Sequence, residues 1–159
     1  MKITIISVGK IKEKYYRDAV AEYAKRLGRY CRLEIMEAED EKTPDGAGAT
    51  LEDQIRAKEA ERILRYIKED AYVVTLEIQG KTFDSPALAG KIESLMVQGI
   101  SHLQFIIGGS LGLHERVCAR ADLSLSFSEL TFPHQLMRVI LLEQIYRCFR
   151  IIHKEPYHK

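Results

Sequence analysis

Apolar residues along the chain alternate between a strand-like and a helix-like period. Short runs rich in β-branched residues have the spacing of strands, and the longer segments between them carry apolar residues every three or four positions. The expected strands are 2–8, 32–38, 72–78, 103–108 and 123–130, and the expected helices are 11–30, 51–69, 85–98, 113–120 and 134–152. Strands that alternate with helices are typical of βαβ units, so the pattern predicts an α/β fold with a parallel sheet.

The segments that follow the strands are the places to expect chemistry, because ligands of parallel sheets bind beyond the carboxyl ends of the strands. They are residues 79–82, 108–112 and 127–133. Residues 39–50 differ from the rest of the chain, since they combine acidic residues with Pro44 and two glycines, and we expect a mobile loop there.

The last predicted helix, 134–152, is apolar on two sides, and its polar strip is narrow. Glu143 and Arg147 lie in that strip with the i,i+4 spacing of an ion pair. A sheet covers only one side of a helix, so a partner subunit is the simplest cover for the other and a homodimer is expected. A helix enclosed within one chain is the alternative.

Composition narrows the class of protein. A chain of 159 residues with 46% hydrophobic and 30% charged residues suits one folded domain spanning 1–159 and excludes a disordered or collagen-like chain. No apolar run reaches the roughly 18 residues of a membrane span, and the start lacks the apolar core of a signal peptide, so we expect a cytoplasmic protein. Three scattered cysteines and five histidines without ligand spacing predict reduced thiols and no metal site.

Charge is distributed unevenly although the formal net charge is only +1. Residues 1–32 hold nine Lys and Arg against three acids, and 134–159 hold five against two, whereas the middle is acidic. If the two ends meet in the fold, they form a basic surface that attracts phosphate. Ordinary solvated helix faces are the other explanation.

Residues 108–112, Gly-Gly-Ser-Leu-Gly, match the GxSxG turn of α/β-hydrolases, with Ser110 as the nucleophile and Asp122 and His134 following in the right order. The chain is short for that fold, and Asp122 precedes a strand instead of following one. A small serine hydrolase is therefore kept as an alternative to a glycine turn that approaches a ligand.

Two further segments suit a nucleotide. Residues 126–135 leave a strand through Ser, Glu and Thr among Leu and Phe, and such a loop grips a flat heterocycle through its backbone. The tail 153–159 holds His153, Tyr157 and His158 near Arg147 if it folds back, which suits base stacking and phosphate binding.

Five segments together resemble a known family: MKITIISVGKIKEKYY at the start, TLEIQGK (75–81), FIIGGSLGL (105–113), LSFSELTFPHQLMRVILLEQIYR (125–147) and the final PYHK. They are similar to the small, single-domain SPOUT methyltransferases that modify a pseudouridine of bacterial large-subunit ribosomal RNA. The resemblance implies a parallel-sheet α/β/α fold with a C-terminal deep trefoil knot over about 105–152, and a homodimer.

The resemblance also implies S-adenosylmethionine (SAM) as methyl donor and N3 of a pseudouridine in 23S ribosomal RNA as acceptor, in the assembled ribosome. It places the cofactor contacts on Leu76, Gly108, Phe127, Ser128, Glu129, Leu130, Thr131 and Phe132. Arg147 is expected to meet substrate phosphate or the developing imide anion, and Tyr157 and His158 the base, with His158 the better proton acceptor. The tail is expected to serve the partner's site. A non-catalytic dimeric RNA-binding module remains the second alternative.

Overall fold

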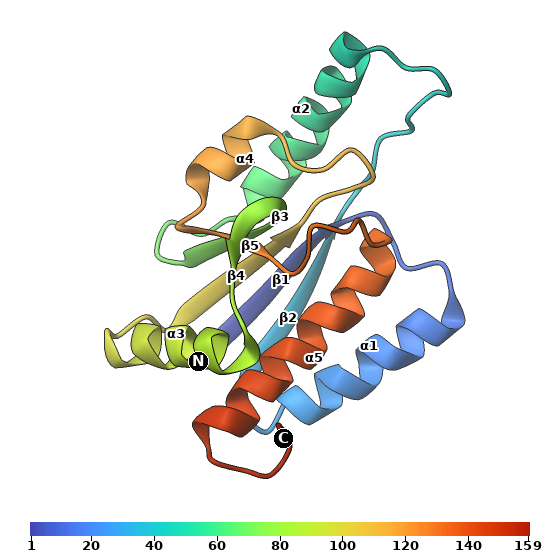
Figure 1. Ribbon diagram of the computed structural model, residues 1–159. Helices are drawn as coiled ribbons and strands as arrows, with labels where there is room; N and C mark the ends of the chain where they lie inside the picture. The colour runs from blue at the N-terminus through green and yellow to red at the C-terminus, as the bar shows by residue number, and fades with distance from the viewer.

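A five-stranded parallel sheet, in the order β2-β1-β4-β3-β5, forms the centre of the computed structural model, which describes residues 1–159 (Figure 1). The elements in chain order are β1 (Lys2–Val8), α1 (Lys14–Leu27), β2 (Arg32–Ala38), α2 (Ala49–Tyr66), β3 (Tyr72–Thr82), α3 (Ser85–Val97), β4 (His102–Ile107), α4 (Glu115–Arg120), β5 (Leu123–Ser126) and α5 (His134–Ile152). The predicted parallel α/β sheet is confirmed.

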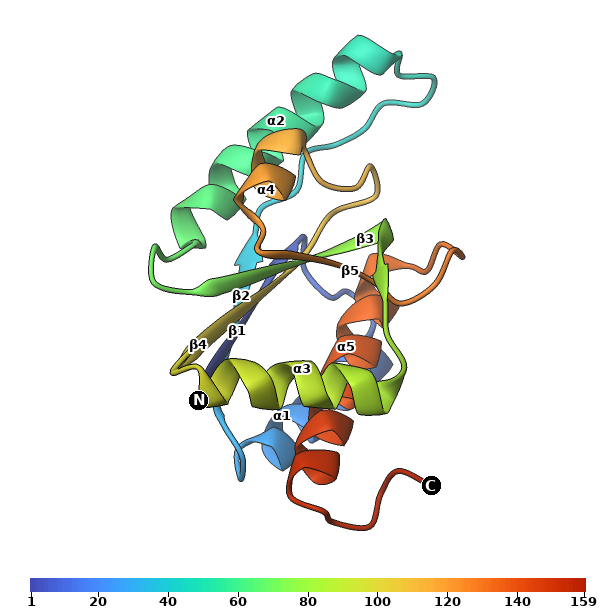
Figure 2. The ribbon, with the colours of Figure 1, turned by 60° about the vertical axis from the view of Figure 1, so that its left-hand side comes forward.

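Helices cover both faces of the sheet (Figure 2). The larger core lies under α1, α3 and α5, and the smaller one under α2 and α4. Strand residues alternate between them, so Ile5 and Phe105 enter the first core while Ile6 and Ile106 enter the second. Each central strand is therefore buried on both sides, which explains its unbroken apolar run.

Helix α1 begins three residues later than its apolar period predicts. Gly9, with φ +83°, turns the chain after β1. The following segment crosses the start of α5, where the Lys12 N–H donates to Gln135 Oε1 at 3.0 Å. These tertiary contacts replace the helical turn expected from Ile11 onward. Helix α2 begins at Ala49, two residues before the expected start at 51, and no side chain caps it behind Gly48.

The region around Gly80 also differs from the expected loop at 79–82, because β3 continues to Thr82. A Cβ atom at Gly80 would lie 2.8 Å from backbone atoms of Ser124 and Leu125, so only glycine lets the two chains come this close. The Ser126 hydroxyl donates to the Ile78 carbonyl at 2.8 Å and to that of Ser128 at 3.2 Å. The chain thus leaves the sheet at Ser126, short of the predicted strand end at 130.

Helix α5 packs between α1 and α3 with a fully buried inner side that includes Arg138, Leu141, Ile145 and Cys148. Its outward side is only half-buried, and there Leu136, Val139 and Ile140 accompany the polar strip. The Cys31 thiol is buried as well, and Cys118 is half-buried; neither pairs with another cysteine. No helix has the length and apolar content to cross a membrane, and no group of three His, Cys, Asp or Glu residues is arranged to hold a metal ion.

Candidate functional site

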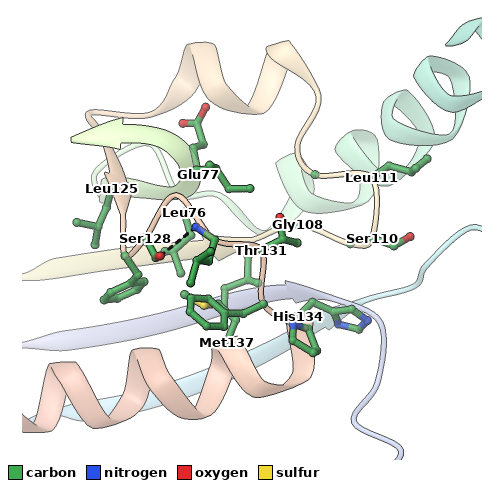
Figure 3. A pocket seen from close by; sticks show the side chains of 18 residues that line it. Leu76, Glu77, Gly108, Ser110, Leu111, Leu125, Ser128, Thr131, His134 and Met137 are labelled. Atoms are coloured by element: carbon green, nitrogen blue, oxygen red, sulfur yellow. Dashed lines mark hydrogen bonds between the residues drawn. The ribbon is translucent and has the colours of Figure 1, made fainter. Parts of the chain in front are cut away.

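A cavity of about 650 Å³ opens where β3, β4 and β5 end (Figure 3). Three stretches of chain and the first turn of α5 form its walls. The lining residues are Leu76, Glu77 and Ile78 from β3, 107–112 after β4, Leu125, Phe127, Ser128 and 130–133 around the exit of β5, and His134 and Met137 from α5. The cavity therefore lies at the sheet edge where the periodicity predicted ligand binding.

The turn at 108–112 forms one wall of the cavity, and a hydrogen bond between two of its glycines closes it. The Gly112 N–H donates to the Gly109 carbonyl at 3.1 Å, and Gly112 has φ +80°. A Cβ atom at Gly108 would lie 2.8 Å from the Gly112 carbonyl carbon and 3.1 Å from a Leu113 methyl group. The turn requires a glycine there because it folds tightly on itself, and Gly108 also lines the cavity.

The opposite wall, residues 127–132, exposes unpaired backbone groups. The Leu130 N–H donates to Ser128 Oγ at 3.0 Å, and the Ser128 carbonyl accepts from Ser126. No other backbone N–H or C=O group of residues 127–132 has a partner within the protein. Most backbone groups in folded proteins are paired, so a run of free ones beside a cavity is suited to hydrogen bonding with a polar heterocycle.

Glu77 lies within β3, two residues beyond Thr75, where the pairing with β4 ends. Its side chain points away from Ser128 and Thr131 toward α4 (Figure 3), and the Thr75 hydroxyl donates to its carboxylate at 2.6 Å. Burial would raise the pKa of Glu77, but hydrogen bonds from Ser124, Thr75 and Cys118 outweigh it and hold the pKa below its ordinary value. The carboxylate is thus ionised, and its hydrogen bonds are made with the protein itself.

His134 is the second titratable residue of the lining. Its Nδ1 atom is buried without a hydrogen-bond partner. Burial, followed by the nearby charge of Arg138, lowers the pKa of His134, so the ring is neutral at pH 7. The cavity consequently contains no cationic side chain, which suits a ligand that is itself positively charged.

The structure brings together seven of the eight residues predicted to contact the cofactor: Leu76, Gly108, Phe127, Ser128, Leu130, Thr131 and Phe132. Glu129 is exposed and does not line the cavity. Sequence reasoning did not single out Glu77 or Met137, and it named His134 only as a possible triad member and as part of the 126–135 segment. The i,i+3 spacing of His134 and Met137, directly after the 127–133 loop, is the signal that places them on one side of the first helical turn.

The tail after α5 folds back along the outward side of the helix. Arg147 donates to Glu143 Oε1 from Nε at 3.1 Å and from Nη2 at 2.6 Å, confirming the predicted pair. The Tyr157 hydroxyl donates to the same oxygen at 3.1 Å, and the Arg147 guanidinium lies 4.6 Å from the centre of the Tyr157 ring. Burial, with Glu143 close by, raises the pKa of Tyr157 to about 12, so its hydroxyl keeps its proton at neutral pH.

A second group of side chains fixes the turn where the tail begins. Glu155 accepts a hydrogen bond from the Tyr30 hydroxyl and forms an ion pair with Arg150, and its N–H donates to the Arg150 carbonyl at 2.8 Å. The Tyr30 ring stacks on Phe149, with centroids 5.6 Å apart and planes 8° apart. This short C-terminal segment is therefore anchored by side chains on both sides of the turn.

His158 reaches a second hollow of about 620 Å³ beside the cavity. Phe127 and Phe132 line both spaces, and Phe83, Ile140 and Gln144 complete much of the second. His158 Nδ1 lies 3.4 Å from Arg147 Nη1. A guanidinium only donates, so Nδ1 accepts and the neutral ring carries its proton on Nε2. In this tautomer the ring presents an N–H donor at Nε2.

The hydrolase triad is not assembled. Asp122 accepts a hydrogen bond from the Val73 N–H at 2.8 Å and lies 3.5 Å from Arg120 Nη1. His134 Nδ1 has no partner, so no carboxylate orients the ring. Without an Asp–His pair, Ser110 lacks the general base that a serine nucleophile needs.

Comparison with known proteins agrees with this geometry. Residues 1–158 match the family model described as "Predicted SPOUT methyltransferase". The chain is 63% identical to the ribosomal RNA large subunit methyltransferase H of Bifidobacterium adolescentis and 58% identical to that of Clostridium beijerinckii. It is 60% identical to a putative methyltransferase of the same name from Methanococcus maripaludis. All three alignments span 159 residues and cover 100% of both chains.

A solved structure extends the comparison to the fold. It is that of a probable methylase family protein from Haemophilus influenzae Rd KW20, with a TM-score of 0.53 and 13% identity, covering 99% of this chain and 70% of that one. At this identity the likeness concerns the arrangement of strands and helices alone.

Proposed function

Because this chain belongs to the SPOUT methyltransferase family, we propose that it transfers a methyl group from SAM to N3 of a pseudouridine in large-subunit ribosomal RNA. Its full-length relatives carry the name of a ribosomal RNA large subunit methyltransferase. The pseudouridine target and the assembled ribosome as substrate come from the resemblance of the five sequence segments. This activity implies a cytoplasmic location.

The observation that carries the proposal is the cavity at the strand exits. Its volume and its free backbone groups at 127–132 fit a nucleoside, and its lack of cationic side chains fits a positively charged sulfonium. SAM, when bound, supplies a methyl group on that sulfonium for nucleophilic attack. Leu76, the turn at Gly108 and residues 127–132 would hold it, with Phe127 and Phe132 on the side of the second hollow.

The second hollow is suited to the target base. Phe83, Phe127 and Phe132 offer flat apolar surfaces on which a base can stack, and His158 lies at its edge. N3 belongs to the base-pairing edge, so the base must be unpaired or swung out of its stack before it enters. Because the two spaces share Phe127 and Phe132, the acceptor nitrogen would face the cofactor across these rings.

Arg147 and His158 would stabilise negative charge on the imide while N3 loses its proton to water. Arg147 is always cationic, and His158 presents an Nε2 proton in its neutral form. Donors aimed at the place where charge develops lower a barrier most in a partly dry site. Tyr157 keeps its proton and orients Arg147 through the ring contact and their shared partner, Glu143.

We propose that two copies of the chain pair through the outward side of α5. Leu136, Val139 and Ile140 are partly exposed there, and just before the helix Leu130 and Phe132 are 70% and 36% exposed. Exposed apolar side chains of this kind mark an interface. Light scattering is expected to give a dimer, and a monomer at micromolar concentration would contradict this.

The tail lies on the same outward side of α5 as this apolar surface, since Tyr157 binds Glu143 and Arg147 of the polar strip. In a dimer, each tail would therefore lie at the interface, within reach of the partner's cavity. The family resemblance predicts such sharing, in which a partner's tail would join a cavity whose adjoining hollow already holds the same chain's His158.

The family resemblance also predicts a knot over about 105–152 within a single domain, 1–159. The contact of Gly80 with β5 and the Ser126 bond to Ile78 are consistent with the end of β3 wrapping the chain that leaves β5. A threaded chain is expected to refold slowly after full denaturation, whereas refolding within milliseconds would argue against threading.

The direct test of function uses labelled SAM and ribosomes that lack the modification. Label is expected on N3 of one pseudouridine of the large subunit, with weaker labelling of free ribosomal RNA. Saturable SAM binding without transfer to any RNA would contradict the proposed reaction. RNA binding with neither SAM binding nor transfer is the result expected of a non-catalytic RNA-binding module.

A further inference from the structure

The segment that follows β1 carries a concentration of exposed cations and one exposed aromatic ring. Lys10, Lys12, Lys14 and Arg17 are all exposed, and the Tyr15 side chain is 64% exposed. We call these five residues the basic strip. Tyr15 is supported from behind by Tyr16, whose ring centre is 4.5 Å from its own. A ring of this size exposed on a charged surface has no role in the core.

The first part of the basic strip, at Lys10 and Lys12, lies next to the start of α5, which lines the cofactor cavity. A Cβ atom at Gly9 would be 3.6 Å from the His134 ring, and the Lys12 N–H is bonded to Gln135. His134 lines the cavity, and Figure 3 shows it beside the chain that leaves β1. The segment before α1 thus adjoins the start of α5, where the cavity opens (Figure 1).

Most of the positive charge in the basic strip is not neutralised by the protein. Lys10 and Lys12 form no ion pair, although Asp40 adjoins Gly9. Arg17 donates to the carbonyls of Ile11 and Lys12 at 3.4 and 3.0 Å, which orients it and leaves its charge unmatched. Lys14 is paired with Asp18 at 2.7 Å. At least three cations therefore remain available to an anionic partner.

We propose that the basic strip binds the ribosomal RNA next to the target nucleotide, with Lys10, Lys12 and Arg17 on phosphates and Tyr15 stacked on a neighbouring base. This inference rests on the proposed function, since it assigns a surface to the same RNA. Unpaired cations interleaved with an exposed ring are the combination that binds single-stranded or looped nucleic acid. The strip would hold the strand while the target base enters the hollow beside Phe127 and Phe132.

Two variants test the strip with modification-deficient ribosomes and labelled SAM: one removes two lysine charges, and the other removes the Tyr15 ring. For Lys10→Ala/Lys12→Ala, the KM for ribosomes is expected to rise about tenfold. The slope of log KM against log salt concentration is expected to decrease by about one for each lysine removed. For Tyr15→Ala the KM is expected to rise about tenfold, and Tyr15→Phe should restore it because the ring is kept. In each case kcat, the SAM dissociation constant and the dimer should be unchanged.

The matched control is Lys58→Ala/Lys68→Ala, which removes two exposed lysines that also lack ion pairs but lie on α2 and in the segment after it. The KM of this control should match the wild type. Equal effects of both lysine pairs, or a strip variant whose dimer or SAM binding is altered, would overturn the assignment. A wild-type chain that labels no ribosomes would refute the proposed function itself, whereas normal transfer with an unchanged KM in the strip variants refutes the strip alone.

Discussion

The two ends of α5 hold the functional groups of this protein by different means. At its start, the cavity is built from backbone: a glycine turn, a loop with free N–H and C=O groups and a few apolar side chains. Beyond its end, the tail is held by side chains, with Glu143, Arg147 and Tyr157 in one cluster and Tyr30, Arg150 and Glu155 in another. Substitutions that alter backbone shape should therefore impair the cavity at the start of α5, and substitutions that remove a charge should impair the tail beyond its end.

The largest expected effect comes from adding one methyl group to the glycine turn. In Gly108→Ala the new Cβ would lie 2.8 Å from Gly112, so the turn must shift and the wall of the cavity with it. The SAM dissociation constant, measured by calorimetry, is expected to rise on the order of 100-fold. Gly90→Ala is the control, because a Cβ there meets nothing within 4 Å, and it should bind SAM normally.

Removing a charge at the other end should leave SAM binding intact. In Glu143→Gln, a neutral amide replaces the acceptor shared by Arg147 and Tyr157, and hydrogen bonds to a neutral acceptor are about half as strong. The rate of methyl transfer is expected to fall about tenfold at saturating SAM. Glu22→Gln removes an exposed pair with Arg26 at the same spacing, and a similar loss of rate there would show that the effect is not specific to the tail.

Mixed dimers test whether the two ends cooperate within one chain or between chains. A Gly108→Ala chain keeps its tail, and a chain lacking residues 156–159 keeps its cavity. If a cavity works with the partner's tail, half of the dimers from an equal mixture gain one intact site, so about a quarter of wild-type activity is expected. No activity above that of the separate variants would place each cavity with its own tail.

The smallest expected effect concerns pH. The two titratable residues of the cavity, Glu77 and His134, both have a pKa below the ordinary value, since hydrogen bonds hold one ionised and burial holds the other neutral. Between pH 7.5 and pH 6.5, Glu77 therefore stays ionised and His134 stays mostly neutral. The SAM dissociation constant should change less than about twofold over that interval. A tenfold weakening at the acidic end would show that His134 gains a proton inside the cavity.

The sequence predicted the elements better than the paths between them. Apolar periods located every strand and helix because the central strands are buried on both faces and α5 on its inner side. The periods carry no information on the order of the strands in the sheet. They also do not reveal close approaches between distant segments, such as that of Gly80 to β5, where β3 continues through the expected loop. The contact that delays the start of α1 joins residues 12 and 135, and no local pattern signals a pair so distant in the chain.

For the site, the resemblance supplied residues that the structure gathers into one cavity, with Glu129 the exception. Composition could not give the partners of the tail, because Tyr30 and Glu155 are distant in sequence and are joined only when α1 and α5 pack together. Likewise, the orientation of the His158 ring follows from its contact with Arg147, which is a property of the folded tail.

Deleting residues 156–159 tests the division between the two ends of α5 most directly. Glu155 and its anchors remain, while Tyr157 and His158 are lost. Calorimetry should give the SAM affinity of the complete chain, and transfer to modification-deficient ribosomes should fall on the order of 100-fold or more. Undiminished transfer by the shortened chain, or a parallel loss of SAM binding, would contradict this account.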